Sequence, residues 1–345
     1  MIKNGAQIFK KSIVISTGIL VVSLFGIAFF LTSCNPTYPK EKIIEAVKHV
    51  CKDEYSMDVE VSLAGGTLGI FYPMKGLLDA SMSISNDSWE KISNVILIAS
   101  RVALSTDANI KFYCVITQDE RLPEMQVIII KYVEDVRRGM YRDISRDEAF
   151  KRTLFSMNLT PQAKKERTIE KVFDKLGLEE GTREDVMEEF FRSPPSKLKD
   201  IGFWKGHFYL KDISEGEFLA AQMAHRMRID FREKKELSSN YDFRGAEGDF
   251  LVTKTQKYFL VTFKIFEQSE NNEEILKLRR KKIWEILRIA NEVVEGYEFK
   301  NFDFVSLSDE AKEITLWMNS YDVYDFHKKQ SLPVEQLVKA SGEYF

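Results

Sequence analysis

The chain has 345 residues, of which 50 are basic and 53 acidic, so its formal net charge is −3 at pH 7. Residues 1–33 contribute three lysines and no acid, so 50 − 3 = 47 basic residues face 53 acidic residues in the remainder. This excess of acid argues against nucleic acid as a partner and against docking on anionic lipid by charge, because both need a basic surface. The length suggests two domains.

The N-terminus has the three-part pattern of an export signal. Three lysines precede residues 12–31, which are almost wholly apolar, and the apolar run ends in Leu31-Thr32-Ser33-Cys34. This ending resembles the lipobox of bacterial lipoproteins. The resemblance implies that residues 1–33 are a signal peptide, that cleavage follows Ser33, and that Cys34 carries a diacylglycerol and further acyl chains such as palmitate.

The alternative for this segment is an uncleaved membrane-spanning helix, since about 20 apolar residues suffice to cross a bilayer. The lipoprotein interpretation is favoured by the cysteine at the end of the run, by the two small residues before it, and by the Pro-containing tether, residues 34–40. Either way the chain is held at a membrane, in the cell envelope. Asn35 resembles the outer-membrane sorting pattern, which applies if the host has two membranes.

Two cysteines remain after Cys34. Cys51 lies on the apolar stripe of an expected helix, and Cys114 lies on the apolar face of an expected strand. An oxidising compartment permits a disulfide between them. Their apolar surroundings favour two buried free thiols instead.

The first part of the chain predicts a module over residues 41–157. Apolar periodicity indicates helices over 39–52 and 88–104, strands over 55–63, 67–72, 109–117 and 125–133, and a helix from the Ser145–Glu148 capping pattern through Phe155. Residues 158–200 then form an expected connector of two charged helices broken at Gly177 and Gly181, and Pro194-Pro195 marks the boundary to the next module.

The second part predicts a module over residues 201–345. A capping pattern, Ser214–Glu217, opens a helix to about residue 231, and a polar loop is expected over 233–247. Strands over 249–255 and 258–266, a helix over 272–294, strands over 299–307 and 312–319, and a final helix from Leu332 complete the prediction.

The two modules repeat the same order of elements, which suggests an internal duplication. An offset of 190 residues pairs Val115 with Val305 and Asp119 with Asp309, and an offset of 186 pairs Ile130 with Leu316. We therefore expect an α+β fold with two related helix/strand-pair modules, antiparallel sheets and helices on one face. The order resembles the secretion-chaperone-like fold, whose members mostly bind other proteins.

Motifs for catalysis or cofactors are missing from the sequence, so no cofactor or metal is expected. The histidines lack zinc spacing, Asp322, Asp325 and His327 fit a solvated loop as well as a cation site, and neither a Walker A motif nor a G-x-S-x-G motif occurs. The acidic pairs Asp119-Glu120 and Asp309-Glu310 are adjacent residues in turns, where solvation is expected.

One aromatic segment follows the Pro-Pro break, with Phe203, Trp204, His207, Phe208 and Tyr209 within seven residues. If these side chains are exposed, they predict a binding patch, because aromatic residues concentrate at contact cores. The alternative is a hydrophobic strap that joins the two modules.

The sequence therefore predicts a membrane-anchored cell-envelope lipoprotein that acts as a non-catalytic binding or assembly module. Its expected partners are the membrane, through Cys34, and an envelope protein. The alternatives are an envelope hydrolase with an unrecognised active site and a surface adhesin or solute-binding lipoprotein. A deep polar pocket would favour a hydrolase or a solute binder, and a flat aromatic patch around Trp204 would favour a protein partner.

Overall fold

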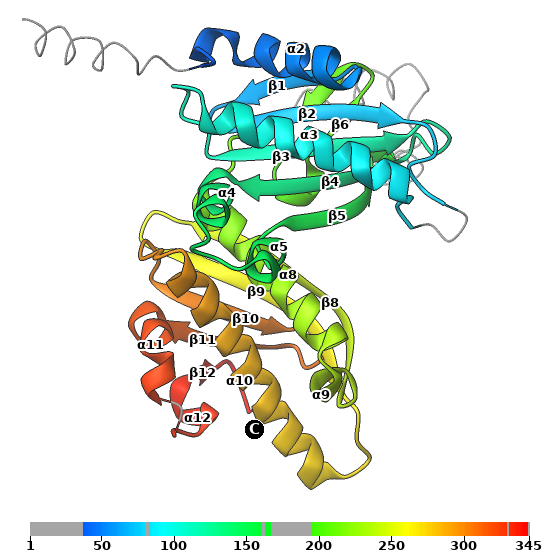
Figure 1. The fold of residues 1–345 in the computed structure, drawn as a ribbon. Coiled ribbons are helices and arrows are strands. Elements are labelled where there is room, and N and C mark those ends of the chain that lie inside the picture. Colours follow the sequence, from blue (N-terminus) through cyan, green and yellow to red (C-terminus); the bar gives the residue numbers. More distant parts are fainter. Residues whose placement is uncertain (1–36, 80–82, 161–162, 167–194, 330, 344–345) are drawn as a thin grey trace, which may run out of the picture.

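A computed structural model describes residues 37–79, 83–160, 163–166, 195–329 and 331–343 (Figure 1). The predicted signal peptide, Cys34 and most of the predicted connector lie outside the described residues. An α+β fold is confirmed, with one five-stranded sheet in each module. Helices long and apolar enough to cross a membrane do not occur within the described ranges.

The first sheet has the strand order β1-β2-β3-β4-β5, with α2 and α3 on one face (Figure 1). Its elements are η1 (Lys40–Lys42), α2 (Ile43–Tyr55), β1 (Glu60–Ala64), β2 (Thr67–Met74), α3 (Asn86–Leu104), β3 (Phe112–Asp119), β4 (Met125–Tyr132), α4 (Val133–Met140), α5 (Arg146–Lys151) and β5 (Leu154–Leu159). The apolar stripe of α3 is buried against the sheet, as the periodicity predicted.

The second sheet has the order β12-β11-β10-β9-β8, with α8 and α10 on one face. Its elements are α8 (Glu215–Glu233), α9 (Lys235–Ser238), β8 (Tyr241–Val252), β9 (Lys257–Glu267), α10 (Asn272–Gly296), β10 (Phe304–Asp309), β11 (Ile314–Asn319), α11 (Ser320–Tyr324), η3 (Phe326–Lys329), α12 (Val334–Leu337) and β12 (Lys339–Ala340). The Ser214–Glu217 capping box is confirmed.

The expectation of purely antiparallel sheets is wrong. β2 runs parallel to β3, and β9 runs parallel to β10. In each module a long helix, α3 or α10, connects these two strands. Such a crossover returns the chain in the same direction, whereas a tight turn reverses it. Both sheets are therefore mixed.

The pairing registers correct part of the proposed repeat. Cys114 pairs with Ile130, and the residue 190 positions after Cys114, Phe304, pairs with Asn319. Ile130 thus corresponds to Asn319, at an offset of 319 − 130 = 189, and not to Leu316. The match of apolar residues at an offset of 186 is misleading, because it lies three residues away from the offset that the strand pairing gives. A shift by an odd number of residues moves a side chain to the opposite face of a strand. The two modules share their strand order and pairing, and their common origin stays a prediction.

Several boundaries also differ from the prediction, and the strands expected over 55–63 and 299–307 begin only at Glu60 and Phe304. The helix expected to continue through Phe155 ends at Lys151, and β5 follows it as an edge strand paired with β4. The loop expected over 233–247 contains α9 and the first part of β8. In place of a helix that runs from Leu332 to the C-terminus, the structure has the short helix α12 and then the strand β12. Pairing with a neighbouring strand outweighs local sequence preference in these segments.

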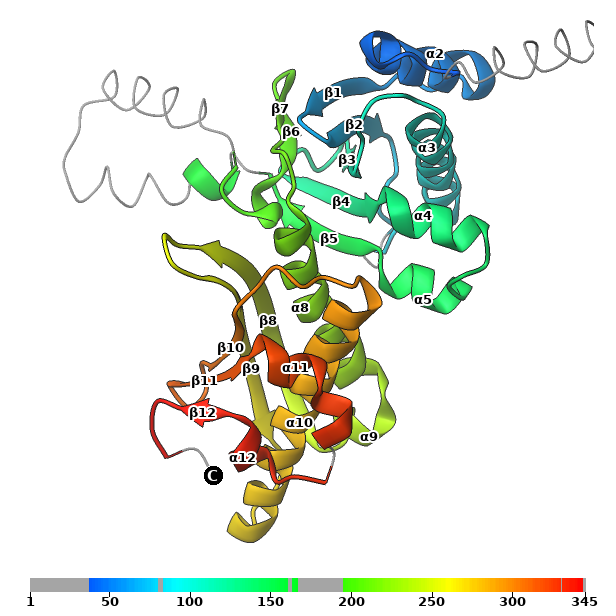
Figure 2. The ribbon, with the colours of Figure 1, turned by 90° about the vertical axis from the view of Figure 1, so that its left-hand side faces the viewer.

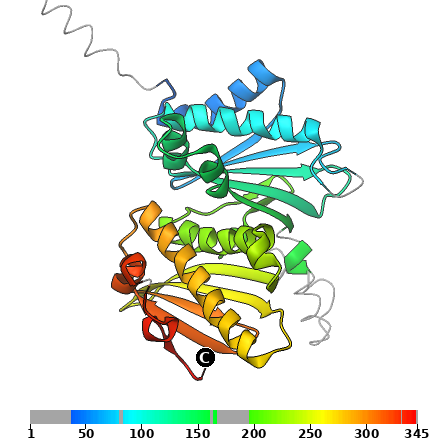
Figure 3. The same ribbon diagram turned by 60° about the horizontal axis from the view of Figure 1, so that its bottom comes forward.

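Helix α8 lies between the two sheets (Figure 3). Its side chains are buried on both sides, and Phe218 contacts Phe112 of β3 with ring centroids 5.1 Å apart. A hairpin of β6 (Gly202–Trp204) and β7 (His207–Tyr209), preceded by η2 (Leu198–Asp200), also packs on the first sheet (Figure 2). One apolar cluster therefore runs from the first sheet through α8 to the second sheet.

Candidate functional site: a cavity between the modules

The aromatic segment predicted as a binding patch forms the β6–β7 hairpin. Phe203 is 7% exposed and stacks on Phe71 with ring centroids 3.9 Å apart, and Tyr209 is 6% exposed. The Gln126 side chain accepts a hydrogen bond from the Phe203 backbone N–H at 3.1 Å and donates one to its carbonyl at 2.5 Å. These contacts fix the hairpin against β2 and β4.

The other aromatic side chains of the hairpin are more accessible. Trp204 and Phe208 are half-buried, and His207 is exposed. A flat exposed surface of all five residues is therefore not formed, because Phe203 and Tyr209 face the core. The hairpin covers the side of the first sheet opposite α2 and α3, as the strap interpretation expects.

A cavity of about 240 Å³ lies between the first sheet and the second module. One wall is apolar and comes from β4 and β5, with Ile128, Ile130 and Leu154. The opposite wall is α8, with the rim supplied by residues 197–199 and β8. The cavity is not apparent from the sequence, because its walls come from segments that are far apart along the chain.

The periodicity of α8 explains which of its residues line the cavity. Ala221, Ala224, His225 and Arg228 are spaced by one, three and four residues, which places them on one side of a helix. The two alanines leave open space against the apolar wall. His225 and Arg228 supply the polar end, and Ser156 and Asn158 of β5 also line it.

The rim charges are already neutralised within the fold. Lys197 Nζ lies 2.7 Å from Asp249 Oδ2, and Lys199 Nζ lies 2.7 Å from Glu247 Oε2. Each pair is half-exposed, so it contributes little to stability. These four residues leave the cavity without a net charge from its rim.

His225 is neutral at pH 7. Burial lowers the pKa of its imidazole to about 4, and the nearby guanidinium groups of Arg228 and Arg226 lower the pKa further in the same direction. Its Nδ1 atom is buried and has no hydrogen-bond partner among the described residues. His225 therefore lines the cavity as a neutral side chain, and its Nδ1 atom is buried within the fold.

Arg228 supplies the positive charge of the site. Its side chain is half-buried, and burial together with the charge of Arg232 lowers the pKa of the guanidinium. Arginine stays protonated in proteins despite such a shift. Within the described ranges, no carboxylate pairs with Arg228, in contrast to the two rim lysines.

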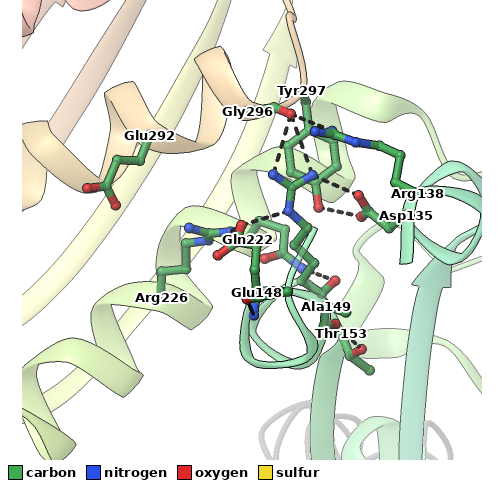
Figure 4. Close-up of polar contacts among 12 residues, drawn as sticks. Asp135, Arg138, Glu148, Ala149, Thr153, Gln222, Arg226, Glu292, Gly296 and Tyr297 are labelled. Carbon is green, nitrogen blue, oxygen red and sulfur yellow. Dashed lines mark hydrogen bonds and ion pairs between the residues drawn. The ribbon is translucent and has the colours of Figure 1, made fainter. Parts of the chain in front are cut away.

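A separate polar network joins the two modules at the other side of α8 (Figure 4). The Arg152 guanidinium contacts Asp135 Oδ1 at 2.8 Å and Glu148 Oε1 at 2.7 Å, and it lies 4.5 Å from the ring centroid of Tyr297. The Tyr297 hydroxyl donates to Asp135 Oδ2 at 2.6 Å, and Gln222 Nε2 donates to the Arg152 carbonyl at 2.6 Å.

Burial and the neighbouring guanidinium groups shift the pKa values of the two carboxyl groups in this network in opposite directions. Burial raises the pKa of Asp135 above its usual range, although Tyr297 and Arg152 counteract it. Burial would also raise the pKa of Glu148, but Arg152 and Arg226 outweigh that effect, and the net shift is downward. The network is filled by its own partners, so we assign it a structural role at the joint between the modules.

The expectation that the acidic pairs are solvated is wrong for their aspartates. Asp119 is 1% exposed and Asp309 is 0% exposed. Each Oδ1 accepts the backbone N–H of the residue two positions later, Arg121 at 2.9 Å and Ala311 at 3.0 Å. The hydrogen bond from the Arg121 side chain lowers the pKa of Asp119. The aspartates close equivalent turns, a feature that sequence adjacency alone did not indicate.

The remaining candidates lie apart from the cavity. Cys51 and Cys114 are buried and free, as favoured, and burial raises the pKa of the Cys51 thiol to about 11. Asp322 pairs with Lys329, and Asp325 pairs with Lys328. In the part of the chain that the structure describes, no group of three or more His, Cys, Asp and Glu side chains is placed to hold a metal ion.

The cavity thus combines an apolar wall with Arg228, which has no carboxylate partner among the described residues, and with two rim lysines that are paired. Comparison with known proteins adds no family to this description: no family model matches the chain, and no match was found among curated proteins or among solved structures.

Proposed function

We propose that the protein is a lipid-anchored, non-catalytic binding protein of the cell envelope, and that the cavity between its modules binds a small anionic ligand with an apolar part. The observation that carries the proposal is Arg228, a half-buried guanidinium without a carboxylate partner among the described residues, in the lining of a cavity that also has an apolar wall.

The energetic argument follows from the cost of burying a charge. A cation that loses water without gaining a partner destabilises the fold, and an anionic ligand would offset that cost through a charge-assisted hydrogen bond. Neutral His225 adds a second polar contact. Ile128, Ile130 and Leu154 would cover the apolar part of the ligand. Ligand pockets commonly measure about 300–1,000 Å³, so a cavity of about 240 Å³ suits a small ligand.

Membrane attachment rests on the N-terminal pattern. Lipidation of Cys34 would place the binding module at a membrane surface, since two or three acyl chains hold a protein stably where one does not. The acidic balance of residues 34–345 offers no alternative electrostatic anchor. This part of the proposal keeps the envelope localisation expected from the sequence, in the outer membrane where the host has one.

Replacement of Cys34 by Ala tests the anchor. We expect the variant to lose incorporation of labelled palmitate and to accumulate as a larger, uncut precursor, because the lipidated cysteine is the implied cleavage point. Cys51→Ala is the matched control and should be labelled and cut normally. Normal processing of the Cys34 variant would contradict the proposed anchor.

Replacement of Arg228 by Gln tests the binding site. We use hexanoate as the probe and hexanamide, which lacks the charge, as its neutral counterpart, with affinity measured by calorimetry. We expect hexanoate to bind wild type better than hexanamide does, and the variant to lose about 10- to 100-fold in hexanoate affinity, since a hydrogen bond to a charged group contributes about 1.5–3 kcal/mol.

Lys199→Gln is the control for this test. It removes a rim cation that Glu247 already neutralises, so hexanoate affinity should change by less than about threefold. Equal binding of hexanoate and hexanamide, or equal losses in the two variants, would show that Arg228 does not form an anion site.

A protein partner is the second candidate function. Met140, Tyr141 and Phe150 are 70%, 74% and 68% exposed around the α4–α5 turn. Large apolar side chains gathered on a surface favour protein contacts. This surface, rather than the hairpin around Trp204, is where an assembly partner would dock.

A further inference from the structure

A lysine and two carboxylates meet inside the second module, away from the cavity. Lys282 of α10 has a side chain that is 0% exposed, and its Nζ lies 2.9 Å from Asp309 Oδ2 at the end of β10. Nζ also lies 2.7 Å from Oε1 of Glu267, whose side chain is 5% exposed at the end of β9. The Phe263 ring is 5.7 Å away.

The charges of these three side chains do not balance. Among these three side chains, one ammonium group faces two carboxylates, and all three are almost fully buried. Transfer of one proton from Lys282 to Asp309 would leave the total charge unchanged and reduce three charges to one. Burial favours the arrangement with fewer charges, because isolated charges are costly in an apolar interior. Such a transfer would supply the uncharged amine and the carboxylic acid that an amide condensation requires.

We propose that Lys282 and Asp309 condense into an intramolecular amide bond, with Glu267 as the proton-transfer group. The Nζ lone pair attacks Asp309 Cγ, and a C–N bond forms. Glu267 takes a proton from the nitrogen. Asp309 Oδ2 then leaves with that proton and its own as one water molecule, so Glu267 ends as the carboxylate it was at the start. The condensation is not a redox step and needs no co-reactant.

The surrounding contacts supply the other requirements of acyl transfer. The Ala311 backbone N–H donates to Asp309 Oδ1 at 3.0 Å, so it polarises the carbonyl and stabilises the oxyanion that forms during attack. Lys282 Nζ also donates to the Ile265 carbonyl at 3.1 Å. After condensation, the amide oxygen keeps the Ala311 N–H, and the remaining amide N–H has Ile265 or Glu267 as acceptor. The buried polar atoms of the product are thus satisfied.

The first module provides an internal comparison. Asp119 closes the equivalent turn with the same backbone hydrogen bond, but its side-chain partner is the Arg121 guanidinium at 2.6 Å. A guanidinium remains protonated and is a poor nucleophile. Residue 92, which lies 190 positions before Lys282, is a buried isoleucine. Asp119 should therefore stay uncondensed in the same molecule.

The bond would hold α10 to the end of β10 covalently. It would close a loop from residue 282 to residue 309, and so restrict the unfolded chain as a disulfide does. Cys51 and Cys114 are free and buried, so they provide no such link. The inference is independent of the proposed ligand and anchor, because it concerns the core of the second module.

Peptide mapping of the full-length protein tests the bond. Folded wild-type chain, extracted in detergent, is digested with chymotrypsin and examined by tandem mass spectrometry. We expect a branched peptide that joins Lys282 to Asp309, lighter than the two separate peptides by one water molecule, and a linear peptide that contains Asp119. If Lys282 and Asp309 were recovered only in separate linear peptides, the proposal would be overturned, and no result from a variant would be needed.

Glu267→Gln tests the proton transfer. The variant preserves the shape of the side chain and removes its basicity, and general acid–base catalysis is worth about 10²–10⁴-fold in rate. We expect the branched peptide to form at least about 100-fold more slowly after synthesis, with circular dichroism used to verify the fold. Asp119→Asn is the control and should leave the rate unchanged. An unchanged rate in a folded Glu267→Gln protein would remove Glu267 from the mechanism.

Discussion

Replacement of Arg152 by Met should lower the free energy of unfolding by about 3–5 kcal/mol, because it leaves the buried Asp135 carboxylate without its guanidinium partner and Glu148 with Arg226 alone. Asp135 is as buried as Arg152, each with a side chain that is 6% exposed, and Glu148 is 30% exposed. Met matches much of the apolar length of Arg, so the loss reports the unpaired charges more than a cavity. Chemical denaturation of the full chain at pH 7 measures it.

The pH dependence of this loss gives a second readout. In wild type the pKa of Glu148 is lowered, so its contribution is present above the unfolded-state pKa and is lost as the pH falls. Without Arg152, the folded-state pKa of Asp135, which is already raised in wild type, should rise further, and the pKa of Glu148 should rise from its lowered value although Arg226 remains. The folded variant then binds more protons than the unfolded chain, and its stability should increase as the pH falls from 7 towards 5.

Arg137→Met is the matched control. Arg137 pairs with Glu134 on the surface of α4, where the two side chains are 50% and 42% exposed. Exposed pairs of this kind contribute about 0–1 kcal/mol. If Arg152→Met and Arg137→Met had equal effects, or if the Arg152 deficit did not shrink at lower pH, the network would not stabilise the joint between the modules.

The local pattern of the sequence predicted much of the fold but not the direction of its strands. The α3 stripe around Ile92 and Val95 and the capping box at Ser214 depend on neighbours within a few residues, and both are found in the structure. The parallel pairs depend on how a long helix returns the chain to its sheet. β5 was missed because its pairing with β4, rather than its own alternation, makes it a strand.

The candidate site was less predictable because it combines distant segments. Arg228 belongs to α8, and the apolar wall opposite it comes from β4 and β5 of the other module. In sequence, Arg228 is one of several charges in an amphipathic helix, where a solvated position is the usual expectation. Only the placement of α8 between two sheets turns Arg228 towards a cavity. The same holds for Lys282 and Asp309, whose 27-residue separation (309 − 282) conceals a direct contact.

Helix α8 packs so closely against β8 that Gly248 has no room for a side chain. A Cβ atom added at Gly248 would lie 1.9 Å from the carbonyl oxygen of Ala220 and 2.4 Å from its carbonyl carbon. Both are backbone atoms of α8, so no rotation of a side chain relieves the clash. The helix or the strand must move instead.

Gly248→Ala should therefore lower the free energy of unfolding by about 3 kcal/mol, at the upper end of the usual cost of overpacking. Gly245→Ala is the matched control in the same strand, because a Cβ atom there meets nothing within 4 Å. It should change stability by less than about 1 kcal/mol. Equal melting temperatures of the two variants would contradict the close contact between α8 and β8.

The consequence of this substitution should extend beyond stability. Gly248 lines the cavity together with Ala221, Ala224 and Arg228, so separation of β8 from α8 would widen the site. Folded Gly248→Ala protein should then bind hexanoate more weakly, although Arg228 is retained. Since α8 also contacts the first sheet through Phe218, the displacement should destabilise both modules together, and a single cooperative unfolding transition at lower temperature is the expected result.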